Sequence, residues 1–296
     1  MQDPTKLGAL QRKPDARDIL LGAVQAPATI PATFIPDMSW FVRNYQGETT
    51  FCGEHAAAHL KAILDHNENP TVNQRYTPRY GAIKLKTPGS PVCDGYAPDA
   101  GTDMRSLFKW LETLGADDFE PLENDVTLPI TTYLEASAVT PDMDANAALK
   151  KLGSYAFGNT DFESLTQYVS LKKAALILLK CDDGFWGTAT PIFTTPKYGH
   201  FVCAYAYDEN SLYVIDSADP DDAFMFKKIA KEYVTPEFFF ESGTGIDLPP
   251  IVKQALTSVQ PVPASVQKAL TTGQISLAEQ ILNDIEAALS LIQKEV

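Results

Sequence analysis

Cysteine is scarce in this sequence, and its spacing excludes the commonest structural uses of thiols. The 296 residues include four cysteines, and no two of them form a CxxC pair. A zinc ribbon or a disulfide-dense secreted scaffold needs closely paired cysteines. We therefore expect free thiols by default, although an isolated pair could still form a bridge. The cysteines are Cys52, Cys93, Cys181 and Cys203.

Positive charge and long apolar runs are also lacking. The chain has 24 lysines and arginines against 38 aspartates and glutamates, a formal net charge of -14 and a pI near 4.7. Nucleic acid and anionic membrane surfaces repel such a chain, so we expect no nucleic acid as partner. No run approaches the roughly 18 apolar residues of a membrane span, so no membrane insertion is expected. The first residues, "MQDPTKLGALQRKPDARD", lack a secretory signal, which leaves the localisation undecided between the cytoplasm and delivery by a non-Sec route.

The periodicity of the chain changes from helical to strand-like near residue 170. Apolar residues at helical spacing predict helices over 54–65 and 102–114, the second ended by Gly115. Short runs rich in aromatic and β-branched residues predict strands over 174–180, 200–207 and 211–216. A helical half followed by a sheet half indicates an α+β domain with a cleft between the two halves.

Three segments follow from composition. Residues 1–45 contain many prolines, which predicts an extended arm. Residues 46–245 are expected to form the main domain, and residues 246–296 a helical C-terminal extension. The final helix of the extension has a capping box and one apolar stripe. That stripe is expected to pack on the domain, or to mediate self-association or binding of a protein partner through residues 250–296.

Cys52 is the candidate nucleophile. It stands at the start of a helix, where unpaired backbone N–H groups and the helix dipole favour a thiolate. A thiolate mechanism also needs a base, and the sequence has only four histidines. His55, His59 and His66 share the helical run of Cys52, so only His200 can face the thiol from another element.

Two further residues complete a plausible set for acyl transfer. Asp216 lies sixteen residues after His200, at the end of the next expected strand, and could orient the imidazole, with Asp219 as the fallback. Gln46, six residues before Cys52, could donate its amide N–H to an oxyanion together with the backbone N–H of Cys52. No cofactor is called for.

Two metal readings are weaker alternatives. His55 and His59 at i and i+4 could form part of a metal set with Cys52, but no fourth ligand is offered nearby. The acidic stretch 216–222 lacks the glycine and closing glutamate of an EF-hand loop, so a turn is expected there. We predict no metal site.

These residues resemble the papain-like cysteine peptidases, the C1 family in the broad sense. The family carries an oxyanion glutamine six residues before a cysteine at a helix N-terminus, a Gly-His on a strand, and Asn or Asp about sixteen residues further on. The segments "RYTPRYGAIK" (75–84) and "DGYAPDAGTDMRSLFKWLETLGA" (94–116) are similar to family segments as well. The resemblance covers about residues 14–240. It implies a two-lobed papain-like fold and a peptidase acting on peptide or protein substrates, with Cys52 as nucleophile, His200 as base and acid, Asp216 as orienting residue and Gln46 as oxyanion donor.

The sequence departs from the family at two motifs. The usual C-G-S-C-W is "ETTFCGEH" here, and the usual N-S-W-G is "DSAD", which removes the tryptophan that shields the histidine pair from water. Trp186, in "DDGFWGT", is expected to contact substrate or simply to pack. The departures leave a second hypothesis, a papain-like fold with weak or no turnover that serves as a structural or binding module through its C-terminal helices. A third is hydrolysis of a bacterial cell-wall peptide by the same chemistry.

Overall fold

The described residues fold into a helical half and a sheet half. The computed structural model describes residues 8–13, 15, 29–71, 74–118 and 122–247. The helices are α2 (Cys52–Glu68), α3 (Pro78–Lys86), α4 (Met104–Thr113), α5 (Ile130–Tyr133), α6 (Pro141–Ala148) and α7 (Phe162–Lys172). The strands are β1 (Ala9–Leu10), β2 (Thr102–Asp103), β3 (Leu152–Gly158), β4 (Ala175–Cys181), β5 (Tyr198–Asp208), β6 (Ser211–Ile215), β7 (Phe226–Ala230) and β8 (Phe239–Asp247). This arrangement confirms the expected α+β class.

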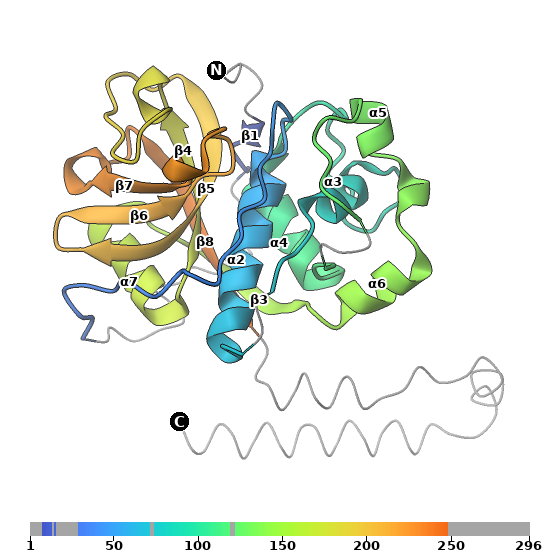
Figure 1. Cartoon of the computed structure of the whole chain (residues 1–296), viewed down its shortest axis with the longest axis horizontal. Coiled ribbons are helices and arrows are strands. Elements are labelled where there is room, and N and C mark those ends of the chain that lie inside the picture. Colours follow the sequence, from blue (N-terminus) through green and yellow to red (C-terminus); the bar gives the residue numbers. More distant parts are fainter. Residues whose placement is uncertain (1–7, 14, 16–28, 72–73, 119–121, 248–296) are drawn as a thin grey trace, which may run out of the picture. The chain divides into compact units, whose positions relative to one another are not determined.

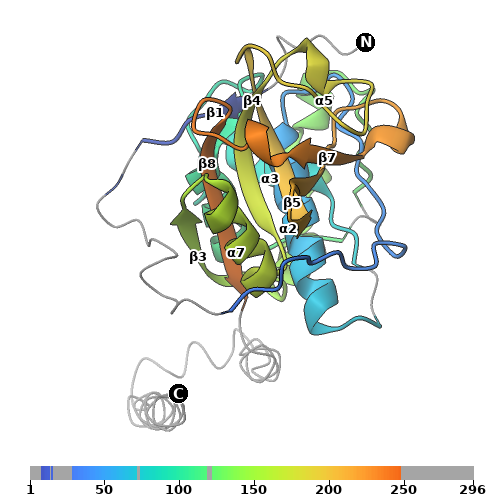
Figure 2. The same ribbon diagram turned by 90° about the vertical axis from the view of Figure 1, so that its left-hand side faces the viewer.

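A six-stranded antiparallel sheet, in the order β3-β8-β4-β5-β6-β7, forms the second half. Side chains alternate across it, as strand geometry requires. On β5, Phe201 and Cys203 join the core shared with α2, α3 and α4, whereas Val202 and Ala204 join a second core with α7. In Figure 1, α2 lies between the sheet and the other helices of the helical half, and Figure 2 shows α7 on the opposite face of the sheet. Helix α2 is therefore enclosed on most of its surface.

The composition of α2 explains how it can lie in that position. Every residue from Cys52 to Leu64 is buried, and half of the apolar ones are alanine. Small side chains allow the sheet and the neighbouring helices to approach closely. At Gly53 an added Cβ would lie 2.9 Å from Cδ1 of Leu107 and 3.2 Å from Cδ2 of Phe201. Glycine after the cysteine thus lets the first turn of α2 pack against both α4 and β5.

The helices and strands expected from periodicity are confirmed, with shifted ends. Helix α4 begins two residues later than expected, because Thr102 and Asp103 form β2 and the Asp103 side chain caps the helix by accepting from the backbone N–H of Ser106 (3.1 Å). Gly115 follows α4 with φ +86°, a left-handed conformation typical of a helix C-terminus. Strands β4, β5 and β6 correspond to the three predicted strands.

The outer segments contribute edges to this core. Within residues 29–45, Phe34 forms an antiparallel bridge with Tyr207, with two 2.9 Å backbone hydrogen bonds. Strand β1 pairs in parallel with β2. Strand β8 runs to Asp247, and the expected helical extension beyond it lies outside the described residues, so the three-segment division stays a prediction. None of the described helices is both long and apolar enough to cross a membrane.

Candidate active site

Cys52 is the first residue of α2 and is fully buried. The helix runs for 17 residues behind it, and no side chain caps its N-terminus. The N–H groups of the first helical turn therefore point toward the region of the thiol, where they favour an anion. All four cysteines are free thiols. Burial raises the pKa of the Cys181 and Cys203 thiols, which makes both poor nucleophiles.

His200 and Asp216 form a fully buried pair. Nε2 of His200 donates to Oδ1 of Asp216 at 2.8 Å, and neither side chain is exposed to solvent. The carboxylate is fixed further by the backbone N–H of Ala218 on Oδ1 (2.9 Å) and that of Asp219 on Oδ2 (3.3 Å). Asp216 is thus the carboxylate that hydrogen-bonds the imidazole, whereas the fallback residue Asp219 bonds to Gly187 and Lys227.

The second ring nitrogen of His200 is the one available for chemistry. Nδ1 is buried and has no hydrogen-bond partner among the described residues. Burial alone would lower the pKa of His200, but the hydrogen bond to Asp216 and the interaction with Cys52 raise this pKa to about 9. Burial would raise the pKa of Asp216, yet its bond to His200 and the nearby Lys227 hold it below the usual value. An imidazolium beside an ionised carboxylate is the favoured state near neutral pH.

Gln46 is held by a residue that the sequence patterns did not single out. Its Oε1 accepts from Oγ of Ser217 (2.8 Å), and its backbone N–H donates to the Ser217 carbonyl (2.9 Å). One N–H of the Gln46 amide donates to the Thr49 carbonyl (3.1 Å). Because an amide carries two donor hydrogens, the second can serve an oxyanion. The signal for Ser217 was its position next to Asp216, but its contact with Gln46 depends on the fold.

Aromatic rings cover the His200 side of the site. The Trp186 ring packs on His200 in an edge-on arrangement with centroids 5.4 Å apart, and Phe185 does the same at 5.8 Å. The two aromatic rings also contact each other, with centroids 4.7 Å apart. Ala218 occupies the position at which the family motif N-S-W-G carries its tryptophan, as the sequence already showed. The indole thus comes from another loop, and this placement was not predicted.

The two other buried histidines have structural partners. Nδ1 of His55 lies 2.8 Å from the Phe51 carbonyl, and its Nε2 lies 3.0 Å from the Asn124 amide nitrogen, which fits a neutral ring. Burial lowers the pKa of His55 to about 4. Nε2 of His59 accepts from the backbone N–H of Asn44 (3.0 Å). The described residues contain no group of three or more side chains suited to hold a metal ion.

A short N-terminal segment, Gly8–Arg12, passes beside these residues. An added Cβ on Gly8 would lie 1.7 Å from the carbonyl oxygen of Thr50, two residues before Cys52. An added Cβ on Gly199, immediately before His200, would lie 2.8 Å from the Ala9 carbonyl oxygen. The backbone N–H of Arg12 donates to Oε1 of Glu241 at 2.9 Å. The segment therefore runs between the neighbours of the two catalytic candidates.

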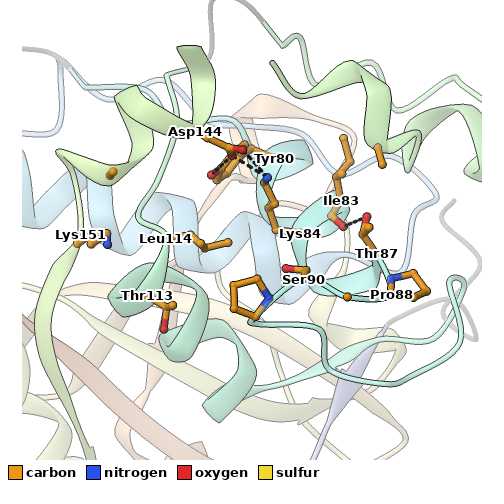
Figure 3. A pocket seen from close by; sticks show the side chains of 14 residues that line it. Tyr80, Ile83, Lys84, Thr87, Pro88, Ser90, Thr113, Leu114, Asp144 and Lys151 are labelled. Carbon is orange, nitrogen blue, oxygen red and sulfur yellow. Dashed lines mark hydrogen bonds and ion pairs between the residues drawn. The ribbon is translucent and has the colours of Figure 1, made fainter. Parts of the chain in front are cut away.

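A large hollow in the helical half contains none of the candidate catalytic residues. It has a volume of about 510 Å³ and is lined by α3, the loop after it, the end of α4, and α6 with the residues that follow it. Figure 3 shows Lys84 and Tyr80 meeting Asp144 at its rim, with Nζ of Lys84 2.7 Å from the carboxylate. These charges are already paired, so the hollow offers no obvious chemistry.

Comparison with known proteins shows the fold. No protein-family model and no curated protein sequence matches the chain. Among solved structures, xylellain, a cysteine protease from Xylella fastidiosa, is similar with a TM-score of 0.69 at 14% identity, over 84% of this chain and 98% of that one. ProCathepsin B S9 from Trypanosoma congolense is similar with a TM-score of 0.61 at 11% identity, over 81% of this chain and 86% of that one. Digestive procathepsin L 3 of Tenebrio molitor is similar with a TM-score of 0.59 at 12% identity, over 78% of this chain and 75% of that one. The fold of this chain is that of the papain-like cysteine proteases.

Proposed function

We propose that the chain is a cysteine peptidase that hydrolyses peptide or protein substrates through Cys52. The observation that carries the proposal is the orientation of His200. Its Nε2 is taken by Asp216, its Nδ1 has no hydrogen-bond partner among the described residues, and the ring interacts electrostatically with the thiol at the start of α2. Acyl transfer by a thiolate needs this division of roles between the two ring nitrogens.

The proposed reaction uses only groups of this chain and water. The Cys52 thiolate attacks the amide carbonyl carbon and forms a C–S bond, and the oxygen takes up the negative charge. The free N–H of Gln46 and the backbone N–H of Cys52 stabilise that oxyanion. Imidazolium His200 then gives its Nδ1 proton to the leaving amine as the C–N bond breaks. A water molecule, deprotonated by His200, attacks the thioester and releases the carboxylic acid and the thiolate.

The first test is covalent labelling of the intact protein. We would incubate it with a dipeptidyl epoxide or vinyl sulfone and map the modified cysteine by mass spectrometry, in the wild type and in Cys52→Ala and His200→Ala variants. Cys93, the one cysteine that is not fully buried, is the internal control for ordinary thiol reactivity. We expect modification at Cys52 alone, with at least about a hundredfold loss in His200→Ala, the range typical of removing a general base.

Two results would contradict the proposal. One is labelling of Cys52 no faster than that of Cys93. The other is cleavage of a peptide library by Cys52→Ala at the wild-type rate. The first would favour a binding module, and a partner for residues 250–296, which lie outside the described residues, would become the question. The second would rule out Cys52 as the nucleophile. Comparison of muropeptides with protein substrates would separate a cell-wall hydrolase from a general peptidase.

A further inference from the structure

A buried lysine lies directly behind the His200–Asp216 pair. Lys227, on β7, is fully shielded from solvent. Its Nζ donates to Oδ2 of Asp219 (3.1 Å) and to the Thr188 carbonyl (3.0 Å), and it lies 3.5 Å from Oδ2 of Asp216. Burying an ammonium is unfavourable unless it is well paired, so a buried lysine needs specific partners.

The two oxygens of Asp216 therefore face different cations. Oδ1 accepts from His200, and Oδ2 lies toward Lys227. Asp219 is the second carboxylate in this cluster and is only 1% exposed. The negative charge of the Asp219 side chain is compensated mainly by Lys227. Arg43 is also close, but it donates to the backbone carbonyl of Asp219 and forms its ion pair with the exposed side chain of Asp222.

A charge count shows what Lys227 does for the site. The ionisable groups that meet here are Cys52 from α2, His200 from β5, Asp216 and Asp219 from the loop after β6, and Lys227 from β7. Arg43 and Tyr45, from the segment before α2, also lie within electrostatic reach of the two carboxylates. His55 and His59 of α2 face the same cluster, and burial lowers the pKa of both rings, so they stay neutral. Cys181 on β4 also lies within electrostatic reach of Asp216, but burial keeps it neutral. With the thiolate and imidazolium formed, Lys227 offsets the second carboxylate. Without it, two buried carboxylates would act on one imidazole.

The same ion pair fixes the loop that carries Trp186. Oδ2 of Asp219 accepts from the backbone N–H of Gly187 (2.7 Å), and Lys227 donates to the carbonyl of the next residue, Thr188. The ammonium also lies 4.8 Å from the Phe185 ring centroid. The pair thus holds the backbone on the C-terminal side of the indole that packs on His200.

We propose that Lys227, paired with Asp219, is a positioning residue of the active site that offsets the second carboxylate, orients Asp216 and holds Trp186 against His200. The role rests on the proposed peptidase function. Lys227 touches no reacting atom; it acts through the two residues that orient and cover the imidazole. A purely structural lysine would stabilise the fold without changing how His200 titrates.

The test is the pH profile of Cys52 alkylation by iodoacetate, which needs no knowledge of the substrate. This anionic reagent reacts best with a thiolate beside an imidazolium, so its rate falls on the alkaline side as His200 loses its proton. The profile would be measured from about pH 5 to about pH 10 for the wild type, Lys227→Met, Asp219→Asn and the double variant. Lys228→Met is the matched control, because the neighbouring Lys228 is 43% exposed and pairs with Asp208 instead (2.8 Å).

Each variant has its own expected shift. Lys227→Met leaves Asp219 uncompensated and should move the alkaline limb up by about one pH unit. Asp219→Asn leaves Lys227 to act on Asp216, which also serves His200, and should move the limb down by about the same amount. The double variant should return to the wild-type limb, and Lys228→Met should not depart from it.

The outcomes separate the two proposals. If the wild type shows a bell-shaped profile but Lys227→Met and Asp219→Asn share its alkaline limb, the role of Lys227 is refuted and the peptidase proposal stands. If the wild type shows no bell at Cys52, the proposed function fails and the role of Lys227 with it. Should Lys227→Met not fold, the shift in Asp219→Asn decides the matter alone.

Discussion

His200 should make the stability of the protein depend on pH in a defined window. The perturbation is His200→Gln, which keeps a polar side chain of similar length but removes the titrating ring. The pKa of His200 is raised from 6.5 to about 9 in the folded protein, so folding favours the protonated ring. We predict that the free energy of unfolding of the wild type, relative to His200→Gln, falls as pH rises through this window.

The magnitude follows from linkage between proton binding and folding. Below about pH 6.5 the ring is protonated in both the folded and the unfolded chain, so the stabilisation is fully present. Between the two pKa values only the folded state keeps the proton, and the advantage is lost progressively as pH approaches about 9. A shift of roughly 2.5 units at 1.36 kcal/mol per unit gives about 3 kcal/mol, an order-of-magnitude figure for a buried pair.

Urea unfolding followed by far-ultraviolet circular dichroism would measure this difference at intervals from about pH 6 to about pH 10. Titrations of other groups, such as Glu54 and His55, occur in both proteins and largely cancel in the difference. His66→Gln, on the last turn of α2 where the ring stacks on Trp40, provides the baseline for the substitution itself. A wild-type minus His200→Gln difference that stays flat across the window would refute the assignment of a protonated, Asp216-bound His200.

Two further predictions concern the neighbourhood of Cys52. Burial raises the pKa of Glu54 to about 7, and Oγ1 of Thr102 lies 2.9 Å from both its Oε1 and Oδ2 of Asp94. One hydroxyl proton cannot serve two carboxylates, and Glu54→Gln supplies a neutral donor instead. The substitution should raise the free energy of unfolding above pH 7 by up to about 3 kcal/mol, and by less near pH 5. Equal effects at both pH values in urea titrations would contradict this prediction. A Cβ at Gly101 would lie 1.1 Å from the Gly8 carbonyl oxygen, so Gly101→Ala should displace β1. The rate at which a peptidyl vinyl sulfone labels Cys52 should then increase severalfold relative to the rate of labelling by iodoacetamide. An unchanged ratio of the two rates would argue that β1 does not restrict access to Cys52.

Local sequence patterns predicted the elements that carry the site better than those that complete the sheet. The alanine-rich run after Cys52 and the aliphatic and aromatic runs of β4 and β5 have strong local signals, and they appear as predicted. Strand β8, which pairs with both β3 and β4, was not foreseen. Its sequence "FFESGTGID" contains glycines at positions 243 and 245, which weaken a strand pattern. The glycines are needed because neighbouring side chains pack directly against the strand: a Cβ at Gly243 would lie 2.6 Å from the Phe108 ring.

The candidate site divides in the same way. Cys52, His200, Asp216 and Gln46 could be proposed because their spacing is visible along the chain, although their catalytic roles stay proposals. Contacts made by loops leave no such periodic trace. Trp186 contacts His200 from a loop whose backbone is bonded by Asp219 and Lys227, and neither residue signals this contact in the sequence.

Strand β1 has a consequence for any extended peptide that approaches Cys52. The Gly8 carbonyl already accepts from the backbone N–H of Thr102 (2.8 Å), and Ala9 lies against Gly199. The edge of β2 that β1 covers is the kind of edge with which an extended peptide backbone can pair. Under the proposed function, a substrate that paired there would compete with β1 for the backbone N–H of Thr102. Its apparent affinity for the whole chain would then contain the free energy of detaching these residues, and we would expect KM to differ between two preparations that differ only before Arg12.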